Sequence, residues 1–164
     1  MKENDNNKKC YEIIEELGIN PLIAHHEPIL DYETAEKVDK ELGWEGTESK
    51  TLFLKGKSGK YYLFITLASE RMDSKLLKSY VNEKVSMVPK DEMVETTNME
   101  PGCMTPFGFD TSIIESIIID PIVFKEKELI AAFGSSTMSM QIKPNDLEKI
   151  LNHCYGEKII YLEK

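Results

Sequence analysis

Apolar side chains recur every three or four residues in two segments near the N-terminus. In the first, the repeat runs from Cys10 to Leu17 and Gly18 follows it, which predicts an amphipathic helix over about residues 6–17. In the second, the repeat between residues 31 and 42 ends just before Gly43. This spacing predicts a second helix that also ends at a glycine.

Two β-rich runs follow, KTLFL at residues 50–54 and YYLFITL at residues 61–67, joined by a turn that contains Gly56 and Gly59. This arrangement predicts a β-hairpin. Both runs are apolar on both faces near their middles, whereas a strand with one solvated face alternates between apolar and polar residues. We therefore expect two central strands of a sheet that is covered on both sides.

The rest of the chain contains shorter helical repeats and shorter β-rich runs. Helices are predicted from Asp73 to about residue 80, from Pro89 to about residue 98 and from Pro144 to about residue 151. Strands are predicted at residues 22–26, 85–88, 117–119, 129–133, 138–142 and 159–162.

This mixture of elements predicts an α+β (mixed α/β) fold with a curved mixed β-sheet of about six or seven strands and helices packed against it. The 164 residues, 41% of them hydrophobic, suffice for one domain with a full core. We therefore expect a single domain spanning residues 1–164, in which residues 1–8 form a mobile tail.

The charge balance narrows the class of partner. With 20 basic and 29 acidic residues the net charge is −9, which disfavours an extended surface for tracking phosphates, so DNA is not an expected partner. The chain has no apolar run long enough to cross a membrane, and residues 1–9 are polar with no hydrophobic stretch behind them, unlike a signal peptide. We expect a cytoplasmic protein that contacts any nucleic acid locally.

The cysteines and histidines do not predict a metal site or a cofactor. The three cysteines, Cys10, Cys103 and Cys154, are odd in number and lack the CxxC spacing of zinc sites. His25 and His26 are adjacent, so on a strand they face opposite sides of the sheet. We therefore expect neither a disulfide framework nor paired metal ligation, and Cys103 lacks a histidine partner evident in the sequence.

The stretch PGCMTPFGF at residues 101–109 fits neither helix nor strand. Its prolines fix φ and its glycines permit unusual backbone conformations, so the loop should have a defined shape. Two interpretations are open. The amides of Cys103, Met104 and Thr105 point into a cleft and bind a carbonyl or oxyanion, or the loop is a rigid connector with its two phenylalanines in the core.

Lysines mark the central hairpin. Alternation along the first strand places Lys50 on the face of Leu52 and Leu54, where its ammonium either lines a pocket or reaches water along an apolar surface. Three more lysines crowd the turn, where they contact phosphates or are simply solvated. The stretch GSST at residues 134–137 offers hydroxyls to a small polar ligand, yet it is also ordinary turn chemistry.

The order of these segments resembles the YbaK/ProX family of aminoacyl-tRNA deacylases, which are related to the editing domain of bacterial prolyl-tRNA synthetases. Nearly the whole chain takes part. The segments are HHEPILDYETAEK (25–37), SKTLFLKGKSGKYYLFITLASERMDSKLL (49–77), EPGCMTPFGF (100–109) and MSMQIKPNDL (138–147). The lysine that begins the central strand and the GxxxP loop, here residues 102–106, are the family's hallmarks.

The resemblance implies a trans-editing enzyme that hydrolyses the ester of a mischarged tRNA without a cofactor or a metal. The expected substrate carries a small amino acid such as Ala on tRNA(Pro). The partners it implies are the acceptor end of the mischarged tRNA and, as a second candidate, prolyl-tRNA synthetase. The implied catalytic residues are Lys50, Gly102 and Pro106. The implied substrate-binding residues are Thr51, Cys103, Met104, Thr105, Phe107, Gly134, Ser135 and Ser136.

Three alternatives remain at this point. Thr51 and residues 134–137 depart from the pattern of several alanine-editing relatives, so the chain is alternatively an editor of Cys- or Ser-charged tRNA. The same departures suit a non-catalytic module that binds aminoacyl-tRNA or partners a synthetase. The last alternative is an unrelated hydrolase that uses Cys103 as its nucleophile.

Overall fold

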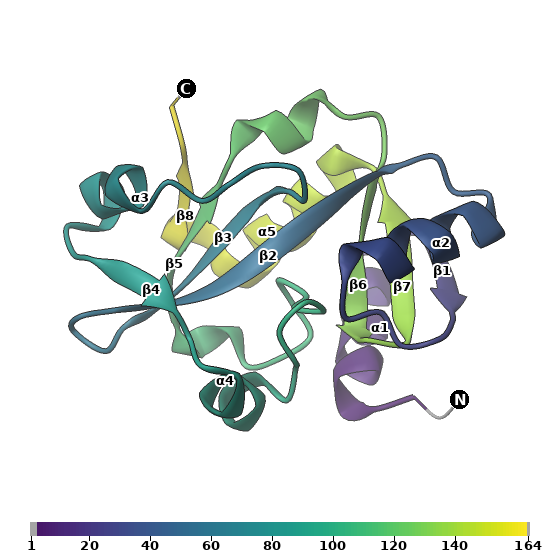
Figure 1. Cartoon of the computed structure of the whole chain (residues 1–164), viewed down its shortest axis with the longest axis horizontal. Coiled ribbons are helices and arrows are strands. Elements are labelled where there is room, and N and C mark those ends of the chain that lie inside the picture. Colours follow the sequence, from purple (N-terminus) through teal and green to yellow (C-terminus); the bar gives the residue numbers. More distant parts are fainter. Residues whose placement is uncertain (1–2, 164) are drawn as a thin grey trace.

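The computed structural model describes residues 3–163 and shows a mixed α/β domain (Figure 1). The helices are α1 (Asp5–Leu17), α2 (Tyr32–Leu42), α3 (Ser74–Val81), α4 (Lys90–Thr97) and α5 (Pro144–Tyr155), with short 3-10 turns at Thr111–Ile113, Pro121–Lys125 and Gly156–Lys158. The strands are β1 (Leu22–His25), β2 (Thr47–Gly56), β3 (Tyr61–Leu67), β4 (Val85–Met87), β5 (Ile114–Ile119), β6 (Leu129–Ser135), β7 (Met138–Ile142) and β8 (Ile159–Tyr161).

The strands form one mixed sheet in the order β1-β7-β6-β2-β3-β5-β8, with β4 paired to β2 beside this path. The predicted hairpins β2-β3 and β6-β7 are antiparallel, whereas β2-β6, β3-β5 and β5-β8 are parallel. The predicted mixed fold is confirmed. The sheet has eight strands within the described residues, slightly more than the six or seven expected, because the three-residue strands β4 and β8 also join it.

The central hairpin is covered on both faces, as its apolar pattern predicted. Side chains on one face of β3, including Leu63 and Ile65, pack in a large core with residues of α1 and α5. Side chains on the other face, including Tyr62 and Phe64, pack with Leu77 of α3 in a smaller core. Figure 1 shows β2 crossing the middle of the molecule between the two parts of the sheet.

Helix α1 begins within the segment expected to be a mobile tail. Asn4 caps it: the Asn4 side chain accepts from the Asn7 amide at 2.8 Å, and the Asn7 side chain accepts from the Asn4 amide at 2.8 Å. Asn6 and Asn7 are buried, only 3% and 1% exposed. The expectation of a mobile tail was therefore wrong for residues 4–8, while residues 1 and 2 lie outside the described part.

Strand β2 has a stretch of edge with no strand beside it in the described structure. It pairs with β6 only at Thr47 and Glu48, and with β4 only from Leu54 onward. Between these points its other edge pairs continuously with β3. The open stretch, residues 49–52, forms one wall of the cavity described below.

No helix within residues 3–163 is long and apolar enough to cross a membrane.

We predict that Gly134→Ala destabilises the fold by about 2 to 5 kcal/mol, combining left-handed backbone strain with overpacking. Gly134 has φ +85°, and an added Cβ would lie 2.8 Å from the Asn6 carbonyl carbon in α1. Gly59 is the matched control: its φ is +93°, but an added Cβ would meet no atom within 4 Å. Gly59→Ala should therefore cost only about 1 to 2 kcal/mol. Urea unfolding measures both, and equal losses would contradict the tight contact between α1 and β6.

Candidate active site

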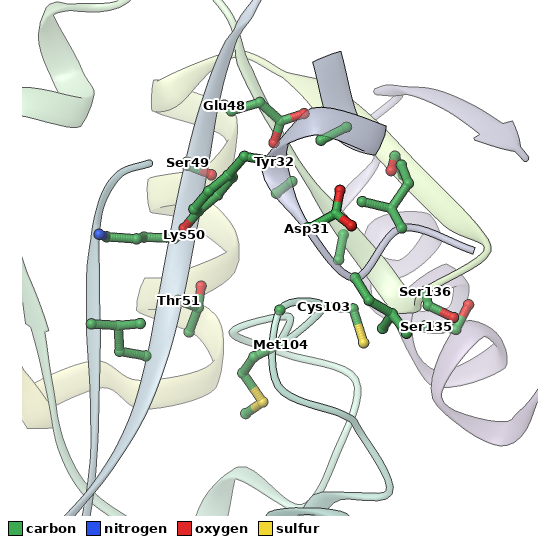
Figure 2. Close-up of a pocket in the computed structure, with 18 residues that line it drawn as sticks. Asp31, Tyr32, Glu48, Ser49, Lys50, Thr51, Cys103, Met104, Ser135 and Ser136 are labelled. Atoms are coloured by element: carbon green, nitrogen blue, oxygen red, sulfur yellow. The ribbon is translucent and has the colours of Figure 1, made fainter. Parts of the chain in front are cut away.

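A cavity of about 190 Å³ lies between β2, the start of α2, the 99–109 loop and the β6-β7 turn (Figure 2). Seven of the residues expected to be catalytic or to bind substrate line it, from three separate segments of the chain. They are Lys50, Thr51, Gly102, Cys103, Met104, Ser135 and Ser136. The structure thus brings the strand lysine and the glycine-containing loop together around one space.

The Lys50 side chain is held at one side of this cavity. Its ammonium donates a hydrogen bond to the carbonyl of Glu70, in the segment after β3. Figure 2 shows the ammonium directed away from Cys103 and Met104. Burial lowers the pKa of Lys50, and the nearby Glu70 carboxylate partly offsets this effect. The lysine is therefore a partly desolvated cation beside the cavity, with one donor already engaged.

The loop places Gly102 at a close contact with the segment before α2. Gly102 has φ +89°, and a Cβ on it would lie 3.1 Å from the Leu30 carbonyl oxygen. A residue without a side chain is required here for both reasons. Both residues line the cavity, so the contact joins the loop to the chain leading into α2 at the cavity wall.

Three loop amides were predicted from the sequence to bind an oxyanion. Two of them already donate to acceptors within the protein. The Cys103 amide donates to the Glu100 carbonyl at 3.2 Å, and the Thr105 amide points to the Met99 sulfur at 3.4 Å. The Met104 amide has no hydrogen-bond acceptor among the residues that the structure describes. Of these three amides, that of Met104 is therefore the spare donor.

Thr105 lies behind the cavity wall and fastens the loop to β6. Its hydroxyl donates to the Ala132 carbonyl at 3.1 Å and accepts from the Gly134 amide at 2.7 Å. The pairing of β6 with β7 is irregular between Ala132 and Ser135, so Gly134 has no register partner in β7. The threonine side chain completes the pairing that the bulged strand leaves open.

Four expected site residues, Thr105, Pro106, Phe107 and Gly134, do not line the cavity. Phe107 is fully buried in the large core, so the connector interpretation holds for its side chain. The Pro106 carbonyl accepts from the Tyr155 hydroxyl at 2.5 Å. These four residues lie behind the cavity lining and support the shape of its wall.

Asn6 and Asn7, at the start of α1, form hydrogen bonds to the 99–109 loop and to the end of β6. The Asn6 amide group donates to the carbonyls of Gly108 at 2.8 Å and Thr97 at 3.1 Å. The Asn7 amide group donates to the carbonyl of Phe133 at 2.7 Å and to the Ser135 hydroxyl at 3.1 Å. The helix start thus links the loop to the β6-β7 turn.

Sequence reasoning overlooked the acidic and aromatic groups of the cavity. Asp31, Tyr32 and Glu48 line it, together with Ser139. Figure 2 shows Tyr32 and Asp31 at the start of α2 and Glu48 on the same strand as Lys50. Glu48 was detectable only by its place in the sequence, two residues before Lys50. The others depend on how α2 packs.

The comparisons with known proteins agree with this arrangement. A family model described as "Aminoacyl-tRNA editing domain" matches residues 30–150, which is most of the chain. The chain belongs to the aminoacyl-tRNA editing domain family. The match includes β2, the 99–109 loop and the β6-β7 turn, so it covers every wall of the cavity.

Individual relatives of this editing domain share its length and fold. The prolyl-tRNA editing protein ProX of Acetoanaerobium sticklandii is 27% identical over 152 residues, which cover 90% of this chain and 85% of that protein. A crystal structure of a proposed trans-editing enzyme for prolyl-tRNA synthetase superposes with a TM-score of 0.75 at 20% identity and covers 99% of both chains. A crystal structure of a hypothetical protein superposes with a TM-score of 0.76 at 18% identity, over 92% of this chain and 95% of that one.

The thiol in the cavity of this editing domain is not activated. Burial raises the pKa of Cys103, which is 4% exposed, and its thiol donates to the Glu100 carbonyl at 3.1 Å. A cysteine nucleophile needs a lowered pKa and a neighbouring base. Within residues 3–163 no group of three or more Cys, His, Asp or Glu side chains is placed to hold a metal ion.

We predict that Thr105→Val destabilises the editing domain by about 1 to 3 kcal/mol, because the isosteric valine leaves the buried Gly134 amide without an acceptor. Thr105→Ser keeps the hydroxyl and should therefore lose less stability than Thr105→Val. Thermal or urea unfolding of the three proteins checks this. If the valine variant were as stable as the wild type, the hydroxyl would not be what holds the loop to β6.

Proposed function

We propose that this editing domain hydrolyses the ester bond of mischarged aminoacyl-tRNA in trans, with a small amino acid such as alanine on tRNA(Pro) as its main substrate. The observation that carries the proposal is the joint lining of one cavity by Lys50 and by residues 102–104 of the loop. Family membership supports the substrate class, and the likeness to ProX supports the prolyl tRNA. The size of the cavity supports a small acyl group.

The proposed chemistry needs little from the protein, because an aminoacyl ester is already labile. The free amide of Met104 stabilises the oxyanion that forms on the ester carbonyl, and one such donor contributes about 10² to 10³ in rate. The Lys50 ammonium binds the terminal adenosine or the ester. Water, or water assisted by a ribose hydroxyl, attacks the carbonyl, and the cavity contributes by holding the reacting groups together.

Three serine hydroxyls of β6, β7 and the turn between them influence which amino acid the cavity accepts. Ser135, Ser136 and Ser139 line it, and they offer hydrogen bonds that alanine does not use. This favours serine or cysteine as the alternative side chain. A panel of Ala-, Ser-, Cys- and Thr-charged tRNAs separates these possibilities.

Contact with tRNA is expected to be local, at the acceptor end. Two lysines of the β2-β3 hairpin are paired with acids: Lys55 lies 3.0 Å from Glu92, and Lys60 lies 3.7 Å from Glu115. With a net charge of −9, the chain has little spare positive charge for the rest of the tRNA. Binding should therefore be weak and sensitive to salt.

A binding module without catalysis is the second candidate. The observation that favours it is the orientation of Lys50, whose ammonium is engaged by the Glu70 carbonyl and points away from the loop. Tight binding of charged tRNA with no deacylation across the panel would establish this alternative.

We predict that Lys50→Ala lowers the deacylation rate by at least about 100-fold while the protein stays folded. The rate is measured on the substrate that the panel identifies, with thermal unfolding as the check on folding. Lys149→Ala is the matched control, since Lys149 lies on α5 outside this cavity and should have no effect. Unchanged turnover in folded Lys50→Ala protein would remove the lysine from the mechanism.

A further inference from the structure

Two carboxyl groups meet at the edge of the cavity, between β2 and α2. Glu48 lines the cavity from β2, and Asp39 projects from α2, where the residue is 9% exposed. Asp39 lies one helical turn beyond Ala35, which lines the cavity, and therefore on the same face of α2. The two carboxyl groups are hydrogen-bonded to each other.

Within the described residues, this pair is short of hydrogen-bond donors and of positive charge. The Asp39 Oδ1 atom is buried and has no hydrogen-bond partner among the described residues. No ion pair joins Asp39 or Glu48 to a lysine or arginine within residues 3–163. A buried carboxylate oxygen without a donor is costly, so its persistence points to a ligand that supplies the missing donor.

The groups around the pair are mostly acidic, although His26 lowers the pKa of Asp39. Glu36 and Tyr32 of α2 face it and add acidic groups. His26, after β1, is the remaining titratable neighbour: its Nδ1 donates to the Glu27 carbonyl at 2.7 Å, and its Nε2 shares a hydrogen bond of 2.8 Å with the Ser139 hydroxyl.

In the absence of a cation the pair retains a proton. Burial raises the pKa of Glu48 far above that of an exposed glutamate, and the hydrogen bond to Asp39 and its negative charge raise it further. Burial also raises the pKa of Asp39, although the hydrogen bond from Glu48 works in the opposite direction. The pair therefore shares a proton, and Glu48 is the weaker acid of the two.

We propose that the Asp39–Glu48 pair binds the α-ammonium group of the aminoacyl ester and so restricts the cavity to substrates with a free amino group. The inference rests on the proposed function and specifies its substrate class. An ammonium brings three donors and a positive charge, the two things that the pair lacks. Aminoacyl esters blocked at nitrogen, such as N-acetylated or peptidyl-tRNA, have neither at that position.

The same strand sets the orientation of the substrate. Glu48 and Lys50 are two residues apart on β2, a separation of about 7 Å along the strand. The ammonium of the substrate is attracted to the acidic pair and repelled by Lys50. Its ester carbonyl is thereby turned toward Lys50 and the Met104 amide. Charge at the two ends of the cavity thus fixes which way round the acyl group enters.

Binding of the cation displaces the proton from Glu48 to solvent. Affinity should therefore increase as the pH rises toward the pKa of Glu48, as long as the α-amino group, whose ordinary pKa is about 7.7 to 8.0, remains protonated. Glu48→Gln has no proton to release, so its affinity should not increase with pH over the same range. This difference separates a charge-binding role from a purely structural one.

The first test compares deacylation of an aminoacyl-tRNA with that of its N-acetylated form. For the wild type, acetylation should lower kcat/KM by about 10- to 100-fold, the loss typical of a hydrogen bond to a charged group. Glu48→Gln and Asp39→Asn should raise KM for the aminoacyl-tRNA with a free amino group by a similar factor. Both variants should then discriminate little between this substrate and its N-acetylated form. Glu92→Gln is the matched control, because Glu92 binds Lys55 and Tyr61 outside the cavity and should leave KM unchanged.

The second test does not depend on catalysis. Nuclear magnetic resonance titration compares binding of a nonhydrolysable 3′-alanylamino-3′-deoxyadenosine with binding of its N-acetyl derivative. The amine form should bind at least about 10-fold more tightly to the wild type and equally weakly to Glu48→Gln. Discrimination without any deacylation would support this inference while refuting the proposed hydrolysis. Equal binding of the two forms, no binding of either, or an unchanged KM in both folded variants would overturn the inference.

Discussion

The hydrogen bonds that hold an irregular loop against a bulged strand are the constraint on which the site depends. Residues 99–109 have no ladder to satisfy their backbone, and buried backbone groups must find partners. Thr105 pairs with two backbone groups of β6, and Asn6 and Asn7 connect the loop and the β6-β7 turn to the start of α1. Met104 lines the cavity that this framework supports, and its amide has no acceptor among the described residues.

The cavity that results has different chemistry on its different walls. β2 contributes both a cation, Lys50, and an acid, Glu48, two residues apart, while the loop contributes an uncharged backbone donor. An aminoacyl ester also has two distinct ends, an ammonium and a carbonyl attached to ribose. The correspondence between them lets a site without a strong nucleophile act on a labile bond, because orientation and oxyanion stabilisation are sufficient.

Much of this structure was predictable from local patterns. The helices ending at Gly18 and Gly43, the two-sided central hairpin and the GxxxP loop all follow from spacing and turn chemistry. The buried role of Asn6 and Asn7 was not, because two asparagines in a polar N-terminal segment look like solvated residues until β6 and the loop are in place. Asp39 was not predicted as a site residue for the same reason. Its burial depends on how α2 packs near Glu48, which the local sequence does not encode.

The most direct test of this account is a crystal structure of the chain with a nonhydrolysable 3′-aminoacylamino adenosine. The account predicts that the acyl group occupies the cavity between β2 and the loop, with its carbonyl oxygen within hydrogen-bond distance of the Met104 amide and Lys50 in contact with the ribose or the acyl group. An analogue bound elsewhere on the molecule, or bound in the cavity with its carbonyl turned away from both groups, would contradict the account.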